Sequence, residues 1–188
     1  LTKILLIIGL GFSLLTGGYL FYLAKTTNVK DLQNALKATT IIYDKNGDQA
    51  GSLTGQKGTY VELDAISENL QNAVVATEDR SFYKNSGINY GRFFLAILTL
   101  GRSGGGSTIT QQLAKNAYLS QDQTVERKAK EFFLALEINK KYSKKEILTM
   151  YLNNAYFGNG VWGIEDASKK YFGVSASQLS LDQSAVLA

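Results

Sequence analysis

The chain of 188 residues contains neither cysteine nor histidine. Without cysteine there is no disulfide framework, and the sequence is compatible with an oxidising or a reducing compartment. Without histidine there is no Ser-His-Asp or Cys-His nucleophile system and no histidine-built zinc site. Any acid–base chemistry within these residues must therefore use carboxylates, lysines or tyrosines.

A long apolar run near the start of the chain sets the first boundary. Ile4 to Ala24 carries no charge and lies between Lys3 and Lys25. At about 1.5 Å per residue, a helix of this length would span roughly the 30 Å hydrocarbon core of a bilayer. A cleaved signal peptide is the alternative, but the run exceeds the usual apolar region of about 7–15 residues and no A-x-A pattern follows it. We therefore expect a single-pass membrane anchor at 1–25, whose orientation the few flanking charges leave open.

Residues 26–60 are expected to form a linker and a short β-hairpin. Thr39–Asp44 and Gln49–Leu53 flank Asn46 and Gly47, a pair typical of tight hairpin turns. From residue 61 to 188 the pattern is helical. Its clearest helix, Thr124–Lys140, has one apolar face, made of Ala129, Phe132, Phe133 and Leu136.

Two further helices have clear start signals. Ser143-Lys-Lys-Glu146 is a capping box that opens one of them. Ser180 opens the last helix, which runs to Ala188. Because this helix reaches the end of the chain, we expect the domain of residues 61–188 to lack its C-terminal part.

The most distinctive charged segment follows a helix predicted over Glu68–Thr77, with Ser67 as its N-cap. This helix runs into Glu78, Asp79 and Arg80. Two carboxylates at a helix C-terminus oppose the helix dipole, which favours cations there. A carboxylate whose charged form is disfavoured in this way is suited to act as a general base. A solvated acidic helix end is the plainer explanation of the same pattern.

A glycine-rich stretch, Gly101–Gly106, is expected to form a mobile loop. Thr108–Asn116 follows as a helix with Ser107 as its predicted cap, and its free N-terminal amides are suited to bind an anionic oxygen. The stretch is not a Walker P-loop, because no Gly-Lys-Ser/Thr closes it.

Two short patterns have ordinary explanations when taken alone. Arg127 and Glu131 lie four positions apart on a helix, which indicates a surface ion pair of small stabilising effect. Ser81 and Lys84 match the S-x-x-K pattern of serine acyltransferases. However, no K-T-G follows and Ser81 does not open a long helix, so this pattern is set aside.

Five blocks, taken together, resemble the family-51 glycosyltransferase domain, the peptidoglycan polymerase module of class A penicillin-binding proteins and of monofunctional transglycosylases. The resemblance covers about Val61 to Ala188. The blocks are Glu-Asp-Arg-x-Phe-Tyr at 78–83, Gly-Gly-Ser-Thr-Ile-Thr-Gln-Gln-Leu-Ala-Lys-Asn at 105–116, Arg-Lys-x-x-Glu at 127–131, Tyr-Ser-Lys-x-Glu-Ile-Leu at 142–148 and Tyr-Leu-Asn-x-x-Tyr-Phe-Gly at 151–158. Four positions depart from residues common in the family: Asn85, Asn89, Leu95 and Gln183.

The resemblance implies a mainly α, lysozyme-like glycosyltransferase domain preceded by a transmembrane helix and the short hairpin. It also implies the polymerisation of lipid II into β-1,4 glycan chains, with inversion and with release of undecaprenyl diphosphate. The reaction would take place on the extracytoplasmic side of the cell membrane. Lipid II, the growing glycan strand, the cytoplasmic membrane and other cell-wall synthesis proteins are the implied partners.

The resemblance also assigns roles to residues. Glu78 matches the catalytic glutamate that acts as general base, and Glu131 matches the second glutamate of the family. Glu131 either orders the cations at the diphosphate or holds a divalent ion, Mg²⁺ or Mn²⁺, and no organic cofactor is expected. The implied substrate-binding residues are Asp79, Arg80, Ser107, Gln111, Gln112, Lys115, Asn116, Arg127 and Lys128.

Two other functions remain as alternatives. A lytic enzyme of similar fold would cleave glycan with one glutamate, but it would not need cations for a diphosphate or a membrane span. A non-catalytic anchored module that binds a cell-wall precursor would not need Glu78. Nucleic acid is not an expected partner, because the basic residues behind the net charge of +4 are dispersed among acidic ones.

Overall fold

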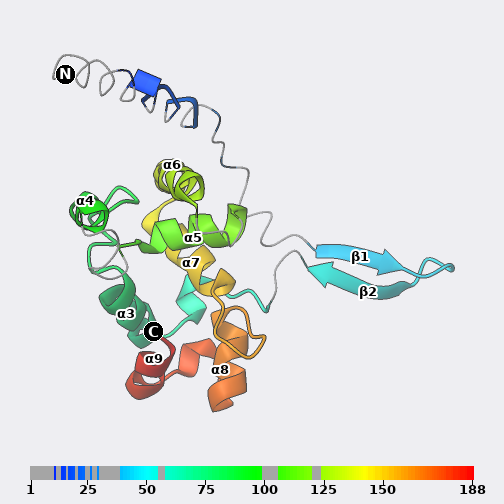
Figure 1. Cartoon of the computed structure of the whole chain (residues 1–188). Helices are drawn as coiled ribbons and strands as arrows, with labels where there is room; N and C mark the ends of the chain where they lie inside the picture. Colours follow the sequence, from blue (N-terminus) through cyan, green and yellow to red (C-terminus); the bar gives the residue numbers. More distant parts are fainter. Residues whose placement is uncertain are drawn as a thin grey trace.

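The structure is a computed structural model that describes residues 39–54, 58–98, 106–119 and 124–188, together with scattered positions between 11 and 29. The described part is mainly helical, as the sequence predicts, and the β-hairpin stands to one side of the helices (Figure 1). Its elements are β1 (Thr39–Tyr43), β2 (Gln49–Thr54), η1 (Leu63–Ala65), α3 (Glu68–Glu78), α4 (Tyr90–Leu98), α5 (Ile109–Tyr118), α6 (Val125–Lys141), α7 (Lys144–Asn154), α8 (Ile164–Phe172), η2 (Ala176–Gln178) and α9 (Leu181–Leu187).

Two predictions fall largely on residues that the structure does not describe. These are the membrane anchor at 1–25 and the glycine loop at 101–106. Single described positions between 11 and 26 are helical. Within the described residues, no helix combines the length and the apolar character needed to cross a bilayer.

The hairpin is confirmed with its turn. β1 and β2 pair antiparallel from Thr39 opposite Thr54, with an irregularity between Ile42 and Tyr43. The Asp44 carboxylate accepts hydrogen bonds from the backbone amides of Asn46 and Asp48, at 2.8 and 2.9 Å. Gly47 has a φ of +88°, which a residue without Cβ adopts at little cost.

The helices α5 and α7 lie at the centre and pack on each other (Figure 1). The core that surrounds them draws on α3, α5, α6, α7 and α8. Its fully buried side chains include Leu70, Phe82, Ile109, Leu113, Ile138, Ile147, Leu148, Met150, Leu152 and Ile164.

Local polar signals begin these central helices. The predicted capping box of α7 is confirmed: the Ser143 hydroxyl accepts from the Glu146 amide, and the Glu146 carboxylate accepts from the Ser143 amide. The predicted cap of α5 was wrong by one residue. Thr108, not Ser107, is the N-cap, and it forms a capping box with Gln111. Thr108 also donates its hydroxyl proton to the Gly87 carbonyl at 2.6 Å, so this side chain is held by two elements.

The helix predicted to end at the acidic segment is α3, and it does end at Glu78, with Asp79 as its C-cap residue. Ser67 occupies the N-cap position, as predicted, but its hydroxyl makes no cap hydrogen bond. It donates instead to the Leu179 carbonyl at 3.0 Å. This bond ties the start of α3 to the segment that leads into α9, and α3 and α9 pack together.

The helix α6 differs from its prediction in the face that it buries. The predicted apolar stripe, which includes Phe132, is only half-buried. The most buried face carries Glu131, Leu134, Ala135 and Ile138. The stripe instead meets α4, where the rings of Phe132 and Phe93 lie 5.0 Å apart. Because α6 packs on α5 with one face and its Phe132 ring contacts α4 with another, no single apolar stripe describes its burial.

Gly87 lies where the turn after α3 crosses α6. Its φ is +93°, and a Cβ at this position would come 2.6 Å from the carbonyl oxygen of Ala135 on α6. Such a separation is shorter than real Cβ atoms show, so only glycine allows the turn and α6 to lie this close.

Candidate active site

The Glu78 carboxylate lies at the C-terminal end of α3 and contacts α5. The side-chain amide of Gln112 donates a hydrogen bond of 2.6 Å to Oε2 of Glu78. The Tyr151 hydroxyl on α7 donates in turn to Oε1 of Gln112, at 3.2 Å. Glu78 is partly exposed, whereas Tyr151 is buried. A chain of two hydrogen bonds thus fixes one oxygen of a carboxylate that solvent and a substrate can still reach.

Tyr151 belongs to a block that was recognised in the sequence, but no role was assigned to it there. Burial raises the pKa of its hydroxyl well above the ordinary value of 10, and the nearby charge of Glu78 raises it further. The hydroxyl therefore remains protonated at working pH and acts as a hydrogen-bond donor. This role is visible only in the structure, because the hydrogen bond joins Tyr151 to Gln112, which lies 39 positions away in the sequence.

Asp79, which was predicted to bind substrate, points into the protein and is 1% exposed. Its Oδ1 accepts from the backbone amide and the hydroxyl of Ser81, at 3.2 and 2.9 Å. Its Oδ2 accepts from Asn85 at 2.9 Å and from the Ile109 amide at 3.4 Å. This geometry does not support direct substrate contact. It shows Asp79 holding the turn after Glu78 to the N-terminus of α5.

Gln111 is likewise turned inward, at 1% exposure. Its side-chain oxygen accepts from the Thr108 amide at 3.0 Å, which completes the capping box of α5. A buried capping side chain is not available to a ligand, so the predicted role of Gln111 in substrate binding has no support in the structure. Gln112, one position later, faces Glu78 instead.

Glu131 lies at the centre of a cluster of cations on α6. Its side chain is 1% exposed, and its two oxygens pair with Arg127 at 3.3 Å and with Lys128. Lys128 also donates to the hydroxyl of Ser107 at 2.8 Å. The sequence alone predicts an ordinary surface ion pair between Arg127 and Glu131. In the structure the Glu131 carboxylate is buried, and it holds Arg127 and Lys128 beside the start of α5.

The surroundings of Glu131 do not fit a metal ion held by the protein. Both of its oxygens already accept from cations. Among the described residues, no group of three or more acidic, histidine or cysteine side chains is placed to bind a metal. Divalent ions in proteins usually require several oxygen ligands.

The remaining predicted residues lie on the outer side of the site. Gln112, Lys115 and Asn116 are spaced so that they share one face of α5, with Lys115 one turn beyond the contact to Glu78. Lys115 and Asn116 are half-buried, and the side chain of neither has a hydrogen bond or ion pair to another residue of the described part. Arg80 is exposed, and its Nε donates to the Ala76 carbonyl at 3.0 Å.

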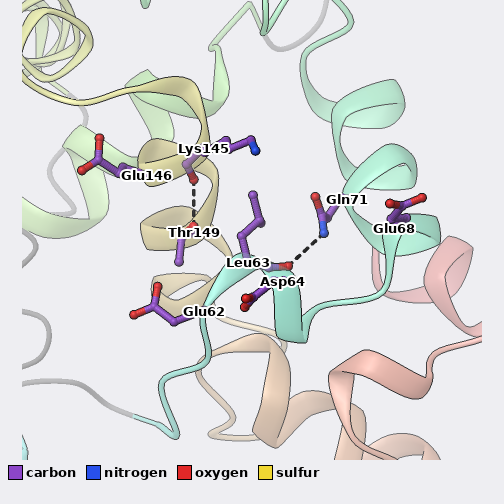
Figure 2. Close-up of a pocket in the computed structure, with 8 residues that line it drawn as sticks. All are labelled: Glu62, Leu63, Asp64, Glu68, Gln71, Lys145, Glu146 and Thr149. Carbon is purple, nitrogen blue, oxygen red and sulfur yellow. Dashed lines mark hydrogen bonds between the residues drawn. The ribbon is translucent and has the colours of Figure 1, made fainter.

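A separate pocket of about 550 Å³ lies between η1, α3 and α7 (Figure 2). None of the predicted site residues lines it. Its walls are formed by Glu62, Leu63, Asp64, Glu68, Gln71, Lys145, Glu146 and Thr149. In this pocket Gln71 donates to the Leu63 carbonyl and Thr149 to the Lys145 carbonyl, so part of its polar surface is already satisfied within the protein.

Comparison with known proteins identifies the family. The profile of the family described as "Transglycosylase" matches residues 46–188. Penicillin-binding protein 2a of Streptococcus pneumoniae serotype 2 (strain D39) is 80% identical over 188 residues, which is 100% of this chain and 26% of that protein. Penicillin-binding protein 1A of Aquifex aeolicus is 46% identical over 78% of this chain and 21% of its own length. For penicillin-binding protein 1F of Bacillus subtilis, the identity is 43% over 81% of this chain and 22% of that protein.

These curated relatives are much longer, and the chain spans about a quarter of the length of the first of them. The family profile covers all of the five blocks that carried the resemblance in the sequence. The chain therefore belongs to the transglycosylase family.

Proposed function

We propose that this domain is a peptidoglycan glycosyltransferase of lysozyme-like fold that polymerises lipid II into β-1,4 glycan chains. The observation that carries the proposal is the placement of Glu78, a partly exposed carboxylate held by Gln112 at one end of α5. The same face of α5 carries Lys115, and its N-terminus adjoins the cluster of cations around Glu131. A base at the end of α3, with cations on α5 and α6 around it, suits a reaction that activates a hydroxyl and releases an anion.

In this proposal Glu78 is the general base. The acceptor is a sugar hydroxyl, which becomes a competent nucleophile when its proton is removed as the new bond forms. The hydroxyl oxygen attacks the anomeric carbon of the donor while the bond to the diphosphate breaks. The proton passes to Glu78, and the electron pair leaves with the diphosphate. One displacement inverts the anomeric centre, so no protein nucleophile is required.

The leaving group is undecaprenyl diphosphate, whose developing negative charge needs cations and hydrogen-bond donors. Lys115, Arg127 and Lys128 would supply the cations, with Ser107 as a neighbouring hydroxyl. Arg127 offers one specific donor: its Nε is buried and has no hydrogen-bond acceptor among the described residues. A phosphate oxygen would satisfy it. Glu131 would hold Arg127 and Lys128 in place between turnovers.

The predicted anchor at 1–25 would keep the domain at the outer face of the cytoplasmic membrane, where its lipid-linked substrate is embedded. The growing glycan strand would be the second substrate, and other cell-wall synthesis proteins are expected partners.

The proposal is tested by polymerisation of lipid II in liposomes, with the full-length anchored protein and its Glu78→Gln variant. This substitution keeps the shape of the side chain and removes the base, and loss of a general base slows catalysis by about 10²–10⁴-fold. Glu68→Gln, at the exposed start of the same helix, is the matched control and should polymerise normally. Chain formation by Glu78→Gln at the wild-type rate would contradict the assignment of the base.

The same assay separates the two alternatives. Cleavage of preformed glycan without chain growth would indicate a lytic enzyme. If both proteins bind lipid II and neither reacts with it, the domain is a binding module.

A further inference from the structure

Lys144, the first residue of α7, contacts the turn that follows Glu78. Its Nζ donates to the side-chain oxygen of Asn85 at 3.1 Å. The same ammonium group lies 4.8 Å from the centroid of the Phe82 ring, which is fully buried. Burial lowers the pKa of Lys144, and attraction to the Asp79 carboxylate offsets part of that shift. A partly desolvated lysine is thus held among groups of the turn rather than in solvent.

Asn85 links this lysine to Asp79. Its side-chain oxygen accepts from Lys144 and from the Gly87 amide, at 3.1 and 2.9 Å. Its side-chain nitrogen donates to Asp79 at 2.9 Å. All three of these contacts use a side-chain amide, which both donates and accepts. Asn85 is one of the positions that depart from the common pattern of the family.

Two polar chains therefore run from α7 to the end of α3. One passes from Tyr151 through Gln112 to Glu78. The other passes from Lys144 through Asn85 to Asp79. Glu78 and Asp79 are consecutive, and Lys144 and Tyr151 lie seven positions apart, on nearly the same face of α7. The two series of hydrogen bonds thus connect the end of α3 to α7 at two points.

We propose that Lys144 is a positioning residue for the proposed catalytic base: through Asn85 and Asp79 it fixes the turn that sets the direction of the Glu78 side chain. The expected loss of kcat rests on the proposed function, whereas the expected loosening of residues 79–87 does not. A buried carboxylate is costly without a compensating charge. Lys144 reaches the buried Asp79 carboxylate through Asn85, and its removal takes a neighbouring positive charge away from that carboxylate.

The experiment uses the full-length anchored protein with Lys144→Met, which keeps the length of the side chain and removes its charge. Lys144→Arg restores a charged donor. Lys145→Met is the matched control, because Lys145 is exposed, adjacent in sequence and directed to the separate pocket (Figure 2). Turnover of lipid II is measured together with hydrogen exchange of the backbone amides in residues 79–87, with those of α8 as the internal reference.

We expect Lys144→Met to lower kcat by about 10- to 100-fold, since a displacement of about 1 Å in a catalytic group can cost about 10²-fold. KM for lipid II should stay within about twofold, because ground-state binding is left in place. Amides of 79–87 should exchange faster, those of α8 should not change, and Lys144→Arg should recover most of kcat. In an Asp79→Asn background the same lysine substitution should cost less, since coupled residues are not additive.

Three results would overturn the inference. The first is normal kcat in Lys144→Met with normal exchange in 79–87. The second is a lower melting temperature with normal kcat per folded molecule, which would mean a purely structural lysine. The third is a raised KM at normal kcat, which would mean that Lys144 contacts substrate. If the wild type does not polymerise lipid II, the proposed function fails, while the exchange data still decide whether Lys144 fixes the turn.

Discussion

The side-chain amide of Gln112 lies 2.6 Å from the Glu78 carboxylate, although 34 positions separate the two residues in sequence. This bond occupies Oε2 of Glu78, and Oε1 has no hydrogen-bond partner in the described part of the chain. The carboxylate therefore has one oxygen fixed in direction and one left to accept a proton.

Tyr151→Phe removes the donor that holds Gln112 and leaves the ring in place. A typical hydrogen bond contributes about 0.5–1.5 kcal/mol, so we expect kcat to fall by about 2- to 10-fold. Since burial keeps the Tyr151 pKa above its ordinary value of 10, the hydroxyl does not titrate below pH 10. The pH profile of the variant should therefore be lower than that of the wild type but unchanged in shape.

The measurement is kcat for lipid II from pH 6 to pH 10, with Tyr43→Phe in the exposed hairpin as the control. An alkaline limb that disappears in Tyr151→Phe would show that this hydroxyl ionises during the reaction and would contradict the prediction.

Lys115→Ala tests the proposed grip on the diphosphate. Lys115 shares a face of α5 with Gln112, and its side chain has no hydrogen bond or ion pair to the described residues, so its ammonium group is available to an anion. Loss of a charged hydrogen bond costs about 1.5–3 kcal/mol, and we expect catalytic efficiency to fall by about 10- to 100-fold. Steady-state kinetics and lipid II binding measure it, with Lys140→Ala as the control because Lys140 is 72% exposed. Unchanged turnover together with unchanged affinity would remove Lys115 from the site.

Glu146 gives a prediction about acid stability. The hydroxyl of Ser143, followed by its backbone amide, lowers the pKa of Glu146 below the ordinary value of 4.5. A carboxyl group whose pKa is lower in the folded state stabilises the fold above pH 4.5, and this contribution is lost as the pH falls through the folded-state pKa. Glu146→Gln keeps the capping box, since glutamine also fits it, but it removes the titration.

We therefore expect the wild type to lose its advantage over Glu146→Gln as the pH falls below 4.5 and through the lowered pKa of Glu146. Thermal unfolding of the two proteins across this range measures the difference. A gap in melting temperature that stays constant with pH would contradict the assignment.

Local chemistry explains what the sequence could predict. Ser143 and Glu146 form a capping box within one turn, Asn46 and Gly47 form a turn between adjacent strands, and α3 ends where Glu78 and Asp79 begin to oppose its dipole. Each of these features depends on residues a few positions apart. For this reason the positions of these elements were predicted well, apart from shifts of one or two residues at their ends.

The site depended on contacts between distant residues, and these explain the differences. Asp79 and Gln111 are neighbours of exposed or partly exposed residues in the sequence, but both side chains are buried in the structure. The choice between Ser107 and Thr108 as N-cap could not be made locally, because both carry a hydroxyl. The hydrogen bond from Thr108 to the Gly87 carbonyl, 21 positions away, fixes Thr108 as the N-cap. The Ser107 hydroxyl is then free of the cap and accepts a hydrogen bond from Lys128.

Gly87 has a consequence for the width of the site. It stands between the turn that follows Glu78 and the helix that carries Glu131, with no side chain to keep them apart. Any larger residue would act as a wedge, because its Cβ would press on the Ala135 carbonyl and push α6 outward. Arg127 and Lys128 on α6 would then move away from Glu78, and the proposed substrate, which must reach both at once, would no longer span the distance between them. The absence of a side chain at Gly87 thus sets the distance between the end of α3 and α6.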